Sequence, residues 1–139
     1  MTTTQTDTFD FLGVTTRVLA TGGTLGLVHQ DVPAGDMPQL HVHRNEDEGF
    51  YVLRGEMTLH LPGQSVTLRS GDFFLAPRDV PHTYETGPDG ARVLVSSAPS
   101  GFERFVMAVA ALDGVSPEIL GALAAEHGIE ILGPPGARP

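Results

Sequence analysis

Three histidines and one glutamate in the middle of the chain have the types and spacing to hold one metal ion. They are His41, His43, Glu48 and His82. His41 and His43 are two residues apart in a strand-like stretch, so both imidazoles point to the same face. Glu48 opens the next extended run, which as an antiparallel neighbour about 5 Å away brings its carboxylate within reach of the same ion. His82 can supply a fourth ligand from another strand. These ligands suit Fe, Ni, Co, Mn, Cu or Zn, and a chain without cysteine has no thiolate site.

Such a site would be open to a substrate. On an octahedral ion the four ligands leave two free positions, which an oxygenase or a Lewis-acid enzyme needs and a purely structural site lacks. Glu48 could also act as a general base on a substrate hydroxyl. By strand parity, the side chains expected to line the pocket are Met37, Gln39, Phe50, Val52 and Tyr84. The competing interpretation is that the histidines are ordinary polar side chains of a β-sandwich.

Two linked motifs carry a family resemblance. The first is Gly35-x5-His41-x-His43-x4-Glu48-x6-Gly55, and the second is Gly71-x5-Pro77-x-Asp79-x2-His82-x3-Thr86. Together they resemble the two motifs of the cupins, with Asp79 where glycine is usual and Thr86 where asparagine is usual. The resemblance implies a β-barrel whose metal ligands are His41, His43, Glu48 and His82.

Turn-rich composition and short strand patterns predict an all-β fold. The 17 glycines and 11 prolines suit many turns, and we expect nine or ten short strands in a jelly-roll barrel. Turns are predicted at 54–56 and 86–90. We expect one domain over 1–139, with the barrel at about 15–100 and a helical extension at 100–132. Glu46, Asp47 and His60 are expected to be exposed.

The C-terminal extension changes from strand to helical periodicity. Ser100 and Glu103 match a capping box before the helical stripe Phe102, Phe105, Val106 and Val109. Ser116-Pro117 predicts the start of a second helix, which Gly128 ends. A last short strand is expected at 129–132. The helices are expected to pack outside the barrel or over one end.

Charge and hydropathy limit the classes of partner. A net charge of −9 disfavours nucleic acid and anionic membrane surfaces. We expect no membrane segment and no signal peptide, and the absence of cysteine favours a cytoplasmic protein. The expected partners are a small-molecule substrate and a second copy in a homodimer.

The chain as a whole resembles bacterial single-domain cupins of the quercetin 2,3-dioxygenase-like kind, through the barrel motifs followed by GFERF and HGIEILGPP. The resemblance implies a metal-dependent dioxygenase acting on a flavonol or a related aromatic or enolic molecule. Two alternatives stay open. One is a metal-assisted cyclase, isomerase or decarboxylase acting on a polyketide-like metabolite. The other is a non-catalytic, metal-containing cupin that binds a small molecule.

Overall fold

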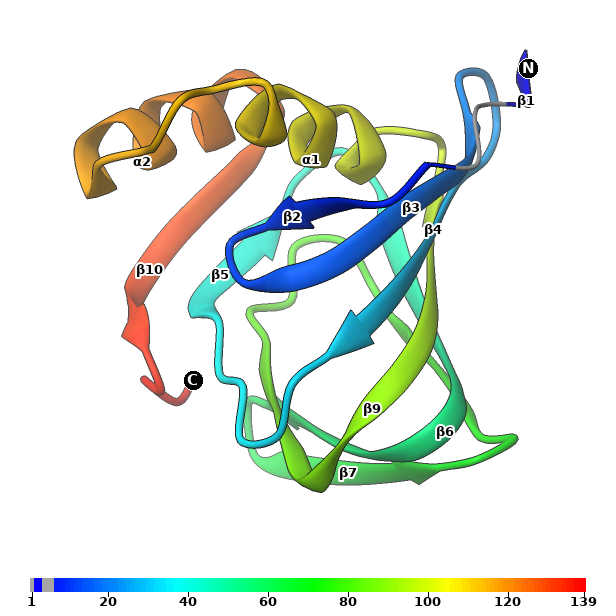
Figure 1. Cartoon of the computed structure of the whole chain (residues 1–139). Coiled ribbons are helices and arrows are strands. Elements are labelled where there is room, and N and C mark those ends of the chain that lie inside the picture. The colour runs from blue at the N-terminus through cyan, green and yellow to red at the C-terminus, as the bar shows by residue number, and fades with distance from the viewer. Residues whose placement is uncertain (1, 4–6) are drawn as a thin grey trace.

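The chain folds into an antiparallel β-barrel with two helices over one end (Figure 1). The computed structural model describes residues 2–3 and 7–139. The strands are β1 (Thr2–Thr3), β2 (Phe9–Phe11), β3 (Val14–Thr21), β4 (Gly26–Val32), β5 (Gln39–His43), β6 (Asp47–Leu61), β7 (Gln64–Arg69), β8 (Phe73–Ala76), β9 (Thr83–Ala98) and β10 (Ile129–Pro135), and the helices are α1 (Phe102–Ala110) and α2 (Pro117–Glu126). The all-β prediction with a short helical segment is confirmed.

One large sheet forms most of the barrel wall. Its strand order is β1-β3-β4-β9-β6-β7, with β2 paired to β3 and β8 paired to β6, and β5 pairs separately with β10. Alternation places one face of each strand inside, so that Val14, Val18, Val28 and Val93 belong to the buried core. An isolated bridge between His41 and His82 joins β5 to the segment before β9.

Two predicted turns are instead parts of long strands. Residues 54–56 lie within β6 and residues 86–90 within β9, and the two strands pair with register shifts at Val52/Arg54 and Gly55/Met57. Gly55 has a φ of 82°, and a Cβ there would overlap the carbonyl oxygen of Gly90. The glycine therefore marks a bulge that bends a continuous ribbon, which its sequence did not distinguish from a turn.

The helical extension begins differently from the prediction. The N-cap of α1 is Gly101, without a side-chain cap, and the predicted cap residue Ser100 instead accepts a hydrogen bond from Arg104. The second helix is as predicted, since Ser116 accepts a hydrogen bond from the backbone N–H of Ile119 and Pro117 starts α2. The final strand extends three residues further than expected, to Pro135.

His60 was expected on the surface, and that expectation is wrong. It is 5% exposed, because Ser65, Glu85 and Arg138 surround its ring with polar contacts.

A buried carboxylate fixes α1 to the barrel. Glu103 is 1% exposed and accepts hydrogen bonds from the hydroxyls of Thr21 and Ser97 and from the backbone N–H of Gly101. Gly26 leaves the space for it, since a Cβ there would overlap the carboxylate. Burial opposes the charge of Glu103, but the hydrogen bonds outweigh it and hold the pKa below its usual range.

We therefore expect Glu103→Gln to lower the free energy of unfolding at pH 7 by about 1–3 kcal/mol. The NH₂ group of the glutamine would face hydrogen-bond donors where the carboxylate oxygen now accepts from them. The folded-state pKa of Glu103 is below its unfolded value. Its contribution is thus present above the unfolded pKa, near 4.3, and lost as the pH falls through the folded pKa. Urea unfolding of both proteins at neutral and acid pH would measure this. A difference that stays constant down to acid pH would contradict it.

Candidate metal centre and pocket

The structure brings the four predicted ligands together inside the barrel. Each side chain offers one ligand atom, and the four atoms all lie within 4.8 Å of one another. The residues are His41, His43, Glu48 and His82. His41 and His43 come from β5, Glu48 from β6, and His82 from the turn that enters β9. His43, Glu48 and His82 are only 1–3% exposed.

Each imidazole is held through its Nδ1 atom. His41 Nδ1 lies 2.7 Å from the carbonyl oxygen of Gln39, and His82 Nδ1 lies 3.2 Å from that of Val80. His43 Nδ1 lies 3.3 Å from Glu46 Oε1. Because these partners are acceptors, each Nδ1 carries a proton, and Nε2 is the nitrogen that faces the centre and would bind a metal on losing any proton of its own.

The donor atoms at the centre fit a cation. His82 Nε2 lies 2.9 Å and His43 Nε2 lies 3.1 Å from Glu48 Oε1. His43 Nε2 is nevertheless buried without a hydrogen-bond partner among the described residues. A buried, unpartnered nitrogen facing a carboxylate and two further imidazoles is what a divalent transition metal would satisfy.

Burial and mutual charge set the pKa values here. Burial, with His82 and His43 nearby, lowers the pKa of His41 to about 3. Burial alone would also lower the pKa of His43, but Glu48 and Glu46 outweigh it and raise that pKa to about 10. Burial favours protonation of Glu48, yet His43 and His82 hold its pKa well below the usual range. Glu48 is thus a carboxylate, the form that binds a metal.

Glu46 is buried, contrary to the expectation from the sequence. It was expected in an exposed turn, but it is 1% exposed and contacts His43. Its Oε2 atom points at Gly101, where a Cβ would overlap it. The room for Glu46 therefore comes from the glycine before α1, a contact 55 residues away in sequence. The other predicted exposed acid, Asp47, is partly exposed and pairs with Arg78.

The two departures from the family motif have local explanations. Asp79 has a φ of 67°, the left-handed conformation that glycine adopts readily and aspartate tolerates. Thr86 donates to the carbonyl oxygen of Pro33 over 2.6 Å and accepts from the backbone N–H of Asp36 over 2.9 Å. Thr86 thereby fixes the connection between β4 and β5.

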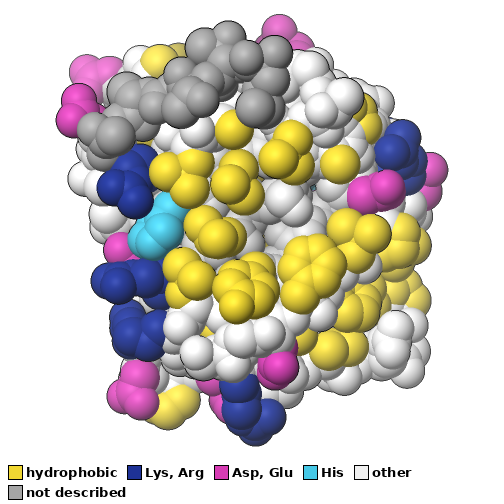
Figure 2. Space-filling view, turned by 90° about the vertical axis from the view of Figure 1, so that its right-hand side faces the viewer, with side chains coloured by type: hydrophobic (Ala, Val, Ile, Leu, Met, Phe, Trp, Pro, Cys, Tyr) yellow, Lys and Arg dark blue, Asp and Glu magenta, His cyan; other side chains and the backbone are white. Residues whose placement is uncertain are grey.

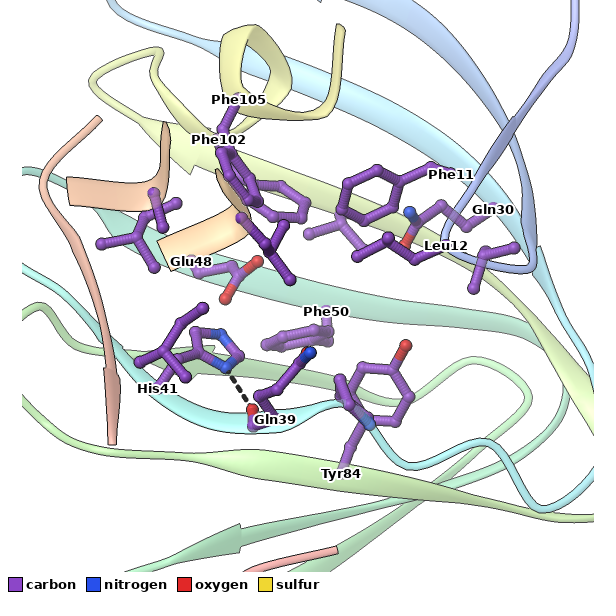
Figure 3. Close-up of a pocket in the computed structure, with 17 residues that line it drawn as sticks. Phe11, Leu12, Gln30, Gln39, His41, Glu48, Phe50, Tyr84, Phe102 and Phe105 are labelled. Carbon is purple, nitrogen blue, oxygen red and sulfur yellow. Dashed lines mark hydrogen bonds between the residues drawn. The ribbon is translucent and has the colours of Figure 1, made fainter. Parts of the chain in front are cut away.

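A mainly apolar pocket adjoins the centre (Figure 3). His41 and Glu48 line it, so the metal centre opens into it. Three of the five predicted pocket residues, Gln39, Phe50 and Tyr84, also line it. The other two do not. Val52 is fully buried in the barrel core. Met37 lies against Gly136, since a Cβ at that glycine would contact the methyl group of Met37.

The helical extension completes the pocket wall. Phe102 and Phe105 of α1, Leu120 of α2 and Ile129 of β10 all line the cavity. Phe102 also packs edge-on against His43, with ring centroids 5.5 Å apart. The extension lies over one end of the barrel, one of the two expected placements, and it shapes the pocket beside the ligands.

Comparison with known proteins gives one sequence relative and many solved structures. Quercetin 2,3-dioxygenase of Bacillus subtilis (strain 168) is 33% identical over 85 residues, which are 61% of this chain and 25% of that protein. The chain therefore spans about a quarter of the length of this relative. An RmlC-like cupin from Shewanella frigidimarina NCIMB 400 has 27% identity and a TM-score of 0.63, covering 69% of this chain and 86% of that chain.

KdgF from Halomonas sp. has 24% identity and a TM-score of 0.65, covering 70% of this chain and 90% of that chain, and this likeness shows the fold alone. The family model described as "Cupin domain" matches residues 28–97, which contain all four candidate ligands. The match covers half of the chain, and the barrel agrees with it: the chain belongs to the cupin family.

Proposed function

We propose that this protein is a metal-dependent dioxygenase acting on a flavonol or a related aromatic or enolic small molecule. One observation carries the proposal: His41 and Glu48 belong both to the four-ligand cluster and to the wall of an aromatic-lined pocket. A molecule in the pocket would therefore lie beside the metal. The likeness of part of the chain to the Bacillus quercetin 2,3-dioxygenase supports the choice of reaction.

The roles of the chain's own residues follow from their positions. A redox-active divalent metal held by the four ligands would supply dioxygen activation and Lewis acidity. Phe50, Phe102 and Phe105 offer ring faces and edges to a flat substrate and exclude water from it. Glu48 Oε2 accepts no hydrogen bond from the described residues, and its carboxylate borders the pocket (Figure 3), so this oxygen can accept a substrate hydroxyl proton.

Oxygen consumption tests the proposed reaction. Purified protein, with its metal content determined by elemental analysis, would be mixed with a flavonol under air and under nitrogen. We expect oxygen uptake that matches flavonol loss under air, and no loss under nitrogen. Turnover of a flavonol or polyketide without oxygen would replace the proposal by a metal-assisted cyclase, isomerase or decarboxylase. A metal-loaded but inert protein would indicate a binding role.

Glu48→Gln tests the carboxylate as a base. We expect the variant to keep much of its metal, because an amide oxygen can still coordinate, and to lose about 10²-fold or more in turnover per bound metal. Turnover and metal content would be measured on the same sample. The matched control is Glu130→Gln, an exposed carboxylate on β10. If turnover per metal were unchanged in Glu48→Gln, the carboxylate would serve only as a ligand.

Glu46→Gln tests the carboxylate behind His43. Glu46 stabilises the Nδ1–H tautomer and makes Nε2 a better donor, so we expect the exchange to weaken metal binding about tenfold to a hundredfold. Competition with a chelator would give the metal affinity. Asp47→Asn is the control, since Asp47 bonds to Arg78 instead of a ligand. If Glu46→Gln and Asp47→Asn bound the metal equally tightly, Glu46 would have no role in metal binding beyond packing.

We also propose that the protein forms a homodimer through an apolar sheet face. Tyr51 and Leu53 of β6 and Phe73 and Leu75 of β8 point outward and are 37–57% exposed. Figure 2 looks onto this side and shows hydrophobic side chains gathered across it, with arginines along one edge. The face is five strands wide, β8-β6-β9-β4-β3, or roughly 20–24 Å, a width suited to the roughly 800 Å² that each partner of a stable interface buries.

Phe73→Glu should separate the copies, because it places a charge at the most exposed of the four apolar side chains of this face, where the partner would bury it. Light scattering over a range of concentrations would show a dimer for the wild type and a monomer for the variant. Leu132→Glu, at an exposed position on β10, should stay dimeric. A wild type that is monomeric at high concentration would disprove the contact.

A further inference from the structure

We infer that the end of the pocket away from the metal centre recognises a hydroxyl group of the ligand through Gln30 and Tyr84. Figure 3 shows both residues on the opposite side of the pocket from His41 and Glu48. The inference rests on the proposed function only in taking the ligand to bind the metal by its other end.

Gln30 is a largely buried residue that lines the pocket and whose carbonyl oxygen has no donor among the described residues. It lies on the inner face of β4, between Val28 and Val32, and is 5% exposed. Its Nε2 atom donates to the hydroxyl of Thr16 over 3.3 Å, but no described residue donates to its carbonyl oxygen. A carbonyl oxygen in an apolar wall needs a donor, and a hydroxyl group of a ligand in the pocket would supply one.

Thr16 determines which end of the amide is free. The hydroxyl of Thr16 donates its single proton to the carbonyl oxygen of Val14 over 3.0 Å. Towards Gln30 it can therefore only accept, which requires the NH₂ group of Gln30 to face Thr16. The carbonyl oxygen of Gln30 is thus left for the pocket, which Gln30 lines.

Tyr84 adds a second acceptor at the same end. Its phenolic hydroxyl donates to Asp36 Oδ2 over 3.2 Å, and Asp36 is itself held by Thr86 through its backbone N–H. With its proton directed to Asp36, the Tyr84 oxygen offers the pocket only lone pairs. Two acceptors beside a carboxylate favour a neutral donor such as a hydroxyl, and they disfavour a carboxylate or phosphate.

The pocket as a whole therefore fits one class of ligand. Its members have a metal-binding oxygen at one end, a flat aromatic body among Phe11, Phe50 and Phe102, and a phenolic hydroxyl at the far end. Flavonols hydroxylated on the pendant phenyl ring are of this kind, and the unsubstituted flavonol lacks the distal donor.

Binding to the Zn²⁺-loaded protein tests the subsite without turnover, since Zn²⁺ has no redox chemistry. Three probes would be titrated by their absorbance: unsubstituted flavonol, its para-hydroxyphenyl analogue and its para-methoxyphenyl analogue. The hydroxyl on this ring is too far from the chelating oxygens to join them. We expect the hydroxyl compound to bind about tenfold more tightly than the other two, because the methoxy group keeps an acceptor but has no proton to donate.

Substitutions then assign the preference. Gln30→Leu and, independently, Tyr84→Phe should each reduce the preference for the para-hydroxyphenyl compound severalfold, measured as the ratio of its affinity to that of the unsubstituted flavonol. Gln64→Leu, in the exposed β6–β7 hairpin, should keep the preference. Equal binding of all three probes by the wild type, or a preference that persists in both variants, would overturn the inference and leave the dioxygenase proposal intact. If the hydroxyl compound bound more tightly as expected but no oxygen were consumed, the inference would stand and the dioxygenase proposal would fail. Failure of every probe to bind would remove both.

Discussion

The candidate site depends on three hydrogen bonds behind the histidine rings. An imidazole presents its Nε2 lone pair to a metal only when its ring is correctly oriented and its proton lies on Nδ1. Here a carbonyl oxygen of β5, a carbonyl oxygen of the turn before β9, and the Glu46 carboxylate each accept from one Nδ1. The bridge between His41 and His82 fixes two of these acceptors relative to each other. Ring orientation is therefore a property of the strand pairing as well as of the side chains.

The four metal ligands could be predicted from local rules, and the residue that contacts His43 from behind could not. Strand parity was enough to place His41 and His43 together, and motif spacing added Glu48 and His82. Glu46 and Asp47 are adjacent acids at the point where the chain enters β6, and nothing in the nearby sequence tells which is buried. The difference arises at Gly101, whose missing side chain leaves a space that only the folded chain reveals.

The same limit applies to the pocket. Phe50 and Val52 have the same parity and both belong to the barrel core, but only Phe50 also lines the cavity, and Val52 lies further along β6 beside the register shift at Val52/Arg54. The helices were predictable as helices from their apolar stripe and from Ser116-Pro117. Their position was not predictable, because it depends on the buried hydrogen bonds of Glu103 with Thr21 and Ser97. From the nearby sequence alone, Glu103 looks like a residue that only caps the helix. Gln30 likewise resembles any polar residue of a strand until its neighbours are known.

The pairing of β5 with β10 couples metal binding to a long-range contact of the fold. Among the described residues β10 is the regular partner of the strand that carries His41 and His43, in a register that places Ile131 opposite His41 and Ile129 opposite His43. The strand that holds two ligands is thus completed by a partner that lies far away in the sequence, beyond the whole of the large sheet. Such a long-range pair forms at the cost of closing a long loop. A metal ion held by His41 and His43 would bind only the paired arrangement, so it would stabilise this distant contact as well as the four ligands themselves.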